Sequence, residues 1–310
     1  MAGTSQGSNG IADSDVEFRL AMLLTDLRPA FPVAGEKRAT LTETQVYAAL
    51  EWLAGFHGFW WGHVHKSENG LFDRSKLVRP PLQHFEEHGE AIINVGESER
   101  AARVWLNGGY TYLATRQTEY GNLCEEVSEW SEALCHPIEG LDHSVAQHVA
   151  QALAPSPKSD GDAVGLGISE YETLIHGDVK SENLFTNSKG DKVAFFDFQY
   201  VGLGLGVCDL AKLFTCSVPR SMLGKNQLAR LPMGTEEERL LRFYLERIQR
   251  ASGKVYDWEV FVRHWETALV DWLRFQASWG FWGNTEWLEG RVRSILADPE
   301  WMNWLRNSIS

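Results

Sequence analysis

Three oxygen-bearing side chains in one short segment have the types and spacing for phosphoryl transfer. Asp178 and Asn183 lie five residues apart in a loop that follows the apolar residues 173–175, and Asp197 ends a later apolar run. A carboxylate can orient an attacking hydroxyl and accept its proton, while carboxylate and amide oxygens are ligands that Mg²⁺ accepts. We therefore expect Asp178 on the acceptor side, with Asn183 and Asp197 sharing a metal ion.

A β-hairpin is predicted to position these side chains. Residues 184–186 and 193–196 are apolar and flank the turn-forming sequence Ser-Lys-Gly-Asp, which is typical of two antiparallel strands. The hairpin folds back, so Asp197 returns to the loop that carries Asn183. In a blander interpretation, Asp178 and Asn183 form a turn pair that satisfies its own backbone. That interpretation does not account for Asp197.

The rest of the chain is predicted to be mainly helical. Thr42 can cap a helix that runs to about Trp61. Its apolar side chains recur at helical steps: Val46, Leu50, Leu53 and Phe56. A second helical step recurs at Leu123, Val127, Trp130 and Leu134. Pro80-Pro81 opens another helical stretch, and the Thr-Glu-Glu-Glu sequence at 235–238 fits a capping box.

Tryptophans recur every seven residues near the C-terminal end. The series is Trp258, Trp265, Trp272 and Trp279. Seven residues are close to two helical turns, so the four side chains are predicted near one face of a long helix. They could line a pocket for a cationic substrate through cation–π contacts. The alternative is a stripe that packs this helix into the core.

Composition narrows the class of protein. The 310 residues are 44% hydrophobic and 23% charged, a balance typical of globular proteins, and the net charge of −13 argues against a nucleic-acid partner. No apolar run is long enough to cross a membrane, and the first residues lack the pattern of a secretory signal. No pair of the 4 cysteines has Cys-x-x-Cys spacing, so reduced thiols and a cytoplasmic location are expected.

Two other patterns point less strongly to chemistry. The spacing Gly202-x-Gly204-x-Gly206 differs from the dinucleotide-binding sequence G-x-G-x-x-G, and we interpret it as a flexible segment. His57, His63 and His65 lack the companion ligands of a zinc site. His57 lies on an apolar helix face and is predicted to be a core histidine with satisfied hydrogen bonds.

These motifs together resemble a known superfamily. His-Gly-Asp-x-x-x-x-Asn at residues 176–183, followed by Asp197-Phe198, is similar to the signature of aminoglycoside phosphotransferases and choline kinases. Protein kinases share the layout, but they carry Arg in place of Gly177. The resemblance is greatest to the ecdysteroid-kinase-like, or CHK-kinase-like, branch. It rests on Asp-Phe-Gln at 197–199, Leu-Ala-Gly-Phe-His at 53–57, Asp-Leu-Ala at 209–211 and the run 240–248.

The resemblance implies a role for each polar side chain of this segment. Asp178 would be the catalytic base, and Asn183 and Asp197 would be the Mg²⁺ ligands. Lys180 would stabilise charge near the transferred phosphate, or is a solvated loop lysine.

Supporting and nucleotide-binding residues are implied in the same way. Asp209 would brace the catalytic loop by accepting backbone N–H bonds, and His176 would support the same loop. Residues 20–27 resemble the connector between the two lobes of such kinases. Its backbone would contact the adenine of ATP at Leu24, Thr25 and Asp26.

The fold implied is α+β and protein-kinase-like, mostly the helical large (C-terminal) lobe with a catalytic β-hairpin, the small lobe being largely absent. Residues 1–17 are expected to be a disordered tail, 18–27 a remnant strand and connector, and 28–310 the large lobe, with substrate-binding helices and a flexible loop at 155–167. A truncated gene model, a short isoform and a kinase-like protein without catalysis all fit this pattern.

The predicted function is ATP-dependent transfer of a γ-phosphoryl group to the hydroxyl of a small molecule, with ATP and Mg²⁺ as cofactors. Candidate acceptors are choline-like amino alcohols, aminoglycosides and steroids. The alternative is a catalytically inactive kinase-like protein that binds or scaffolds.

Overall fold

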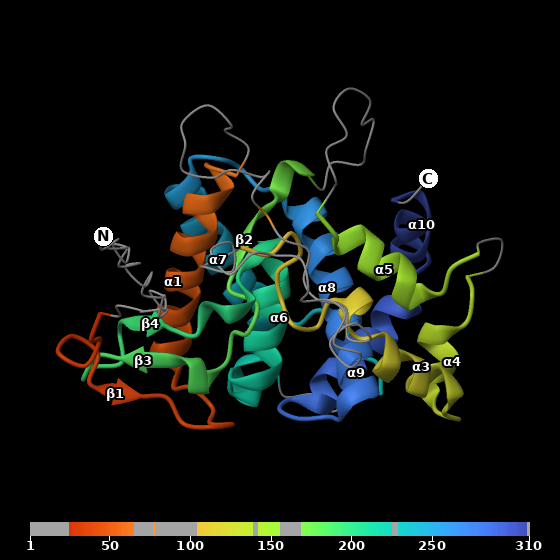
Figure 1. Cartoon of the computed structure of the whole chain (residues 1–310), viewed down its shortest axis with the longest axis horizontal. Coiled ribbons are helices and arrows are strands. Elements are labelled where there is room, and N and C mark those ends of the chain that lie inside the picture. Colours follow the sequence, from red (N-terminus) through yellow and green to blue (C-terminus); the bar gives the residue numbers. More distant parts are fainter. Residues whose placement is uncertain are drawn as a thin grey trace, which may run out of the picture.

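The computed structural model describes residues 25–64, 77, 104–138, 142–155, 169–224 and 229–308. In this part of the chain a mainly helical body carries two small antiparallel sheets (Figure 1). The helices are α1 Glu43–Trp61, α3 Gln117–Glu125, α4 Glu129–Cys135, α5 Val145–Leu153, α6 Val207–Cys216, α7 Thr235–Ser252, α8 Trp258–Trp279, α9 Thr285–Leu296 and α10 Pro299–Asn307. The strands are β1 Val33–Ala34, β2 Thr173–Ile175, β3 Leu184–Thr186, β4 Val193–Phe195 and β5 Gly202–Gly204. The predicted α+β class is confirmed.

The first sheet has the order β1-β3-β4 and contains the predicted hairpin. Strands β3 and β4 pair antiparallel, with Leu184 opposite Phe195 and Thr186 opposite Val193. The second sheet pairs β2 with β5, so that Ile175 lies opposite Gly202. The segment that carries Asp178 and Asn183 therefore runs from the end of β2 to the beginning of β3, between the two sheets.

Helix α1 begins and ends where the sequence predicted. The Thr42 hydroxyl accepts a hydrogen bond from the backbone N–H of Gln45. The Gln45 side-chain oxygen accepts one from the backbone N–H of Thr42, which completes a capping box. Val46, Leu50 and Leu53 are fully buried on the face that the sequence indicated. Helix α1 packs against α7, which runs beside it in Figure 1.

The tryptophan stripe forms one continuous helix, α8, which contacts α5, α6 and α9. Trp265 and Trp272 are buried in the core, whereas the side chain of Trp279 is 56% exposed. A repeat of seven residues falls short of two full helical turns, so the stripe rotates around the helix. The packing interpretation therefore holds for Trp265 and Trp272, but Trp279 reaches the surface of a cleft described below.

Three local predictions are wrong. The helical step from Leu123 to Leu134 is interrupted between α3 and α4, because the Ser128 hydroxyl accepts a hydrogen bond from the Ser131 N–H and caps a new helix, which leaves Val127 exposed. Helix α7 has no capping box at 235–238; its N-cap is Gly234, and its first turn carries acidic side chains that complement the helix dipole. The segment Gly202–Gly204 is the buried strand β5 rather than a flexible loop.

Other predictions fall outside the described residues. They are the strand at residues 18–24, the helical stretch at Pro80-Pro81, residues 156–167 of the loop and His65. Among the helices that the structure does describe, none has the length and apolar character needed to span a membrane.

Candidate functional site

A buried carboxylate holds the loop that leaves β2. The Asp209 Oδ2 atom accepts a hydrogen bond from the His176 backbone N–H at 2.7 Å, and Oδ1 accepts one from the Gly177 N–H at 2.9 Å. Asp209 lies in the first turn of α6 and is fully buried. This carboxylate therefore joins helix α6 to the beginning of the catalytic motif.

The charge of Asp209 is stabilised from several sides. Burial is the largest effect and raises its pKa, but the hydrogen bond and charge of His57, together with Lys212 and His176, outweigh burial and lower the pKa below its usual range. The His57 Nε2 atom lies 3.1 Å from Asp209 Oδ2, and Nδ1 lies 2.8 Å from the Tyr244 hydroxyl. His57 is thus a buried core histidine with both ring nitrogens bonded.

His176 connects the catalytic loop to the end of the hairpin. Its Nδ1 accepts a hydrogen bond from the Asp178 backbone N–H at 3.3 Å, so the proton of the neutral ring lies on Nε2, which donates to the Phe196 carbonyl at 2.8 Å. Burial lowers the pKa of His176, which favours this neutral form. The ring thereby sets the distance between Asp178 and the residue before Asp197.

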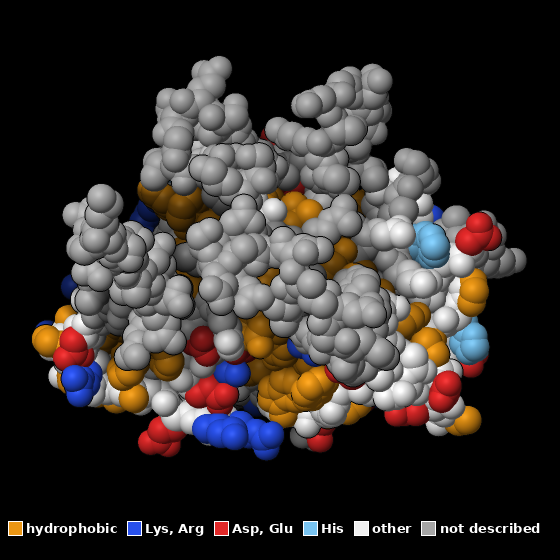
Figure 2. All heavy atoms as spheres, in the orientation of Figure 1, with side chains coloured by type: hydrophobic (Ala, Val, Ile, Leu, Met, Phe, Trp, Pro, Cys, Tyr) orange, Lys and Arg blue, Asp and Glu red, His pale blue; other side chains and the backbone are white. Residues whose placement is uncertain are grey.

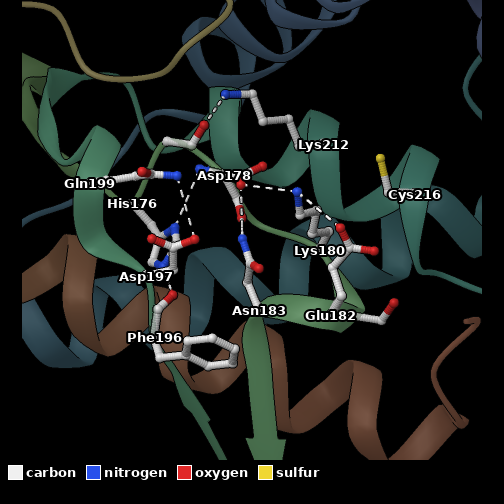
Figure 3. Close-up of polar contacts among 12 residues, drawn as sticks. His176, Asp178, Lys180, Glu182, Asn183, Phe196, Asp197, Gln199, Lys212 and Cys216 are labelled. Atoms are coloured by element: carbon white, nitrogen blue, oxygen red, sulfur yellow. Dashed lines mark hydrogen bonds and ion pairs between the residues drawn. The ribbon is translucent and has the colours of Figure 1, made fainter. Parts of the chain in front are cut away.

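Asp178, Lys180 and Asn183 contact one another directly (Figure 3). The Asp178 Oδ2 atom accepts a hydrogen bond from the Asn183 side-chain amide at 2.9 Å. The same oxygen forms an ion pair with Lys180 Nζ at 3.0 Å. Both contacts engage Oδ2 rather than Oδ1. Lys180 Nζ also lies 3.1 Å from Glu182. Although burial acts to lower the pKa of Lys180, the two carboxylates raise it, so this lysine stays charged.

Asp197 occupies an unusual backbone conformation at the end of β4. Its φ of 65° and ψ of 61° lie in the left-handed region, which Asp tolerates better than most residues. The side chain is exposed, and the contact that it makes is long, 3.5 Å from Gln199 Nε2 to Asp197 Oδ2. The carboxylate of Asp197 therefore remains accessible to a ligand.

The donor set fits Mg²⁺ held together with phosphate groups. The Asn183 side-chain nitrogen donates to Asp178, so its oxygen is the atom left for a cation. Mg²⁺ in kinases is bound by one or two protein side chains, substrate phosphates and water rather than by a protein cage. The described residues contain no cluster of three or more His, Cys, Asp or Glu side chains that could hold a metal ion.

These side chains open into a cleft with a volume of about 710 Å³. In Figure 2, acidic and basic side chains lie next to hydrophobic ones low in the centre of the molecule, between the β3–β4 hairpin and α9 in the view of Figure 1. The cleft is also lined by aromatic side chains: Tyr110, Tyr200, Trp272, Trp279, Phe281 and Trp282. It is further lined by basic side chains that the sequence analysis did not identify: Lys37, Arg38, Arg116 and Lys212.

Some of the cleft residues that the sequence analysis did not identify had a local signal in the sequence, and others had none. Lys212 lies three residues after Asp209 on α6, a spacing that places two side chains on the same side of a helix. Arg116 and Tyr110 lie in an irregular segment, and nothing in their neighbourhood in the sequence relates them to Asp178.

Of the predicted adenine contacts, Leu24 is outside the described residues. Thr25 and Asp26 are exposed and do not line this cleft.

Gly177 has a conformation that other residues adopt at a cost. Its φ is +85°, and a Cβ added there would lie 2.5 Å from the Tyr200 carbonyl oxygen. We expect Gly177→Ala to lower the free energy of unfolding by about 2 kcal/mol or more. Gly55→Ala is the control, because Gly55 is a helical residue with nothing within 4 Å of an added Cβ. Urea denaturation compares the two variants, and equal stabilities would contradict the prediction.

Comparison with known proteins adds a family match. The sequence model of the phosphotransferase enzyme family matches residues 32–247, a range that includes Asp178, Asn183, Asp197 and Asp209. A comparison with curated proteins finds no match.

The solved structures that resemble this chain include two kinases of small molecules. A choline kinase from Cryptosporidium parvum Iowa II is 12% identical, with 89% of this chain and 69% of that chain covered and a TM-score of 0.37. A choline/ethanolamine kinase family protein from Mesorhizobium loti is 13% identical, with 86% and 67% covered and a TM-score of 0.33.

Proposed function

Because the chain belongs to the phosphotransferase enzyme family, we propose that it transfers the γ-phosphoryl group of ATP to the hydroxyl of a small molecule. The observation that carries this proposal is the convergence of Asp178, Asn183 and Asp197 on one cleft. The superfamily that the sequence analysis named agrees with the match. The ecdysteroid-kinase-like branch stays a prediction.

Asp178 is the proposed catalytic base. Asn183 and Lys180 hold its Oδ2 atom, which orients the carboxylate and directs Oδ1 to a substrate hydroxyl. As the hydroxyl oxygen bonds to the γ-phosphorus, its proton passes to Asp178, and the bond from phosphorus to the bridging oxygen breaks and releases ADP. Lys180 places a positive charge beside the reacting groups.

Asn183 and Asp197 are the proposed ligands of the metal ion. The side-chain oxygen of Asn183 and the exposed carboxylate of Asp197 supply the oxygen atoms. When bound, Mg²⁺ neutralises charge on the phosphates of ATP. His176 holds the two ligand-bearing segments at a constant separation through its bonds to Asp178 and Phe196.

Binding of Mg-ATP is expected to stabilise the protein. Ligand at a hundred times its dissociation constant raises the free energy of unfolding by about 2.7 kcal/mol. Asp197→Asn should abolish most of this stabilisation, because it removes the charged metal ligand. Thermal denaturation with Mg-ATP, and with ATP and a chelator, measures the metal-dependent part.

Asp191→Asn is the matched control. Asp191 carries the same charge at the turn of the same hairpin, but it accepts a hydrogen bond from Asn187 and does not line the cleft. It should retain the full response to Mg-ATP. If millimolar Mg-ATP does not stabilise the unmodified protein, the phosphotransfer proposal is wrong. The alternative of a kinase-like binding protein without catalysis then gains support.

A further inference from the structure

We propose that the acceptor is a hydroxyl compound with a flat apolar body and a negatively charged group, which Arg116 and Lys212 bind on the aromatic side of the cleft. This inference rests on the proposed phosphotransfer and adds the chemical class of the acceptor. It is carried by the positions of the cations on the aromatic rings and by the distribution of charge in the cleft.

The aromatic side of the cleft begins beside the proposed base. Tyr110 lines the cleft together with Asp178, and its ring lies 5.2 Å from Tyr200 and 5.3 Å from Phe275 between ring centres. Burial, and then the charge of Asp178, raise the pKa of Tyr110, so its hydroxyl stays neutral next to the carboxylate. A substrate with its hydroxyl at Asp178 would therefore place its body along Tyr110.

Three of the aromatic rings that line the cleft already contact cations of the protein itself. Lys212 Nζ lies 5.1 Å from the centre of the Tyr110 ring and 5.9 Å from that of Trp272. The central carbon of the Arg116 guanidinium lies 5.4 Å from the ring centre of Trp279. Aromatic rings attract substrate cations through their faces. Here those interactions are made within the chain, which disfavours a choline-like acceptor.

Lys212 is a buried cation that acts on Asp209 through its charge but makes no direct ion pair with a carboxylate among the described residues. Its side chain is 4% exposed, it borders the cleft, and its Nζ donates a hydrogen bond to the Gly177 carbonyl (Figure 3). A carbonyl oxygen satisfies one of its three N–H donors but does not neutralise the charge. A buried charge of this kind is stabilised by an anion that enters the cleft.

Arg116 is held in position for the same ligand. Its Nε donates a hydrogen bond to the Tyr110 carbonyl at 2.7 Å, which orients the planar guanidinium. Its Nη1 lies 3.6 Å from Glu119, beyond good hydrogen-bond distance, and Glu119 does not line the cleft. Guanidinium groups bind carboxylate and phosphate oxygens through two parallel N–H bonds.

The acidic groups of the cleft all have a place in the proposed phosphotransfer or pair with Lys180. Among its described lining residues the carboxylates are Asp178, Glu182 and Asp197. Lys180 pairs with the first two, and the third is the proposed metal ligand. The other charged lining residues are basic: Lys37, Arg38, Arg116 and Lys212, of which the last two lie on the aromatic rings. This distribution favours an anionic group on the acceptor.

A series of three alcohols that differ in one charge tests the inference. The compounds are 4-(2-hydroxyethyl)benzoate, 2-phenylethanol and the 4-trimethylammonium derivative of 2-phenylethanol, measured by calorimetry with the full chain and no nucleotide. We expect the carboxylate to bind about ten-fold or more tightly than the neutral alcohol, and the ammonium compound to bind most weakly. Equal affinities, tightest binding of the ammonium compound, or no binding of any member would overturn the inference.

Arg116→Gln should reduce the preference for the carboxylate to about that of the neutral alcohol. Arg250→Gln, at an exposed arginine of α7 that pairs with Glu246, should leave the preference unchanged. Lys212→Met provides a second test if Arg116→Gln does not fold. If Arg116→Gln weakens Mg-ATP binding and leaves the affinity for the carboxylate intact, the arginine binds nucleotide phosphate and the inference is wrong.

Phosphorylation of the same alcohols separates this inference from the proposed function. Preferential binding of the carboxylate without any transfer from Mg-ATP would contradict phosphotransfer and leave the acceptor class standing. Transfer to the ammonium compound, with no preference for the carboxylate, would support phosphotransfer and overturn the acceptor class.

Discussion

Asp178→Asn is expected to lower kcat by about three orders of magnitude with little change in stability, since a positioned general base contributes roughly 10²- to 10⁴-fold. The amide has the size of the carboxylate, and its oxygen can still accept from Asn183 or Lys180. It cannot accept the proton of the substrate hydroxyl. Release of ADP from Mg-ATP, with and without a hydroxyl acceptor, measures the loss.

The control for this variant is Asp191→Asn, which removes one negative charge from the hairpin away from the cleft. It should retain kcat within about two-fold, because a change at an exposed turn far from the reacting groups leaves the base and the metal ligands in place. A variant Asp178→Asn with near-normal kcat would show that another group accepts the proton. A large loss of stability in that variant would instead assign Asp178 a mainly structural role.

Asp209→Ala is expected to lower the free energy of unfolding by about 3–5 kcal/mol, the cost of removing one partner of a buried charged pair. The substitution leaves the backbone N–H groups of His176 and Gly177, and the Nε2 atom of His57, without their acceptor in the protein interior. Urea denaturation measures the change. The catalytic loop should lose its position at the same time.

Asp257→Ala is the matched control for this change. Asp257 is an exposed aspartate that also accepts two backbone N–H bonds, at the beginning of α8, and its loss should cost about 1 kcal/mol. Equal destabilisation by the two substitutions would show that burial and the contact with His57 do not increase the contribution of Asp209 to the free energy of unfolding.

The same aspartate predicts an acid-sensitive contribution to stability. Because the pKa of Asp209 is lower in the folded chain than the usual value of 3.8, its stabilisation is complete above that value. The stabilisation disappears as the pH falls through the lowered pKa, where the folded state also takes up the proton. Unfolding measured from pH 6 downwards should therefore decline less steeply in Asp209→Asn than in the unmodified chain.

Local patterns in the sequence were sufficient to predict the elements that position Asp178, Asn183 and Asp197. The hairpin β3–β4 follows from alternating apolar runs around a turn, and α1 begins at a capping box whose partners are three residues apart. Such features depend on neighbours along the chain. One incorrect prediction arose where local signals competed, at Ser128, where a cap divides an apolar helical pattern into two helices. Another arose at Gly202–Gly204, which is a strand because it pairs with the distant β2.

Several assignments of the sequence analysis stay predictions. They include the tail, connector and large-lobe boundaries, the roles of the individual site residues, and the cytoplasmic location. ATP binding is part of the proposed function, and the experiments with Mg-ATP described above test it directly.

The basic side chains of the cleft, and their contacts with the aromatic rings, could be found only from the packed structure. Tyr110 and Arg116 precede the catalytic loop, Lys212 lies on α6, and Trp272 and Trp279 lie on α8. Apart from the seven-residue spacing of the two tryptophans, these residues share no sequence pattern, and they meet because α6 and α8 pack together in one hydrophobic core. The segment with Asp178 and Asn183 is encoded by interactions between neighbours in the chain, whereas the meeting of Tyr110, Arg116 and Lys212 results from long-range packing.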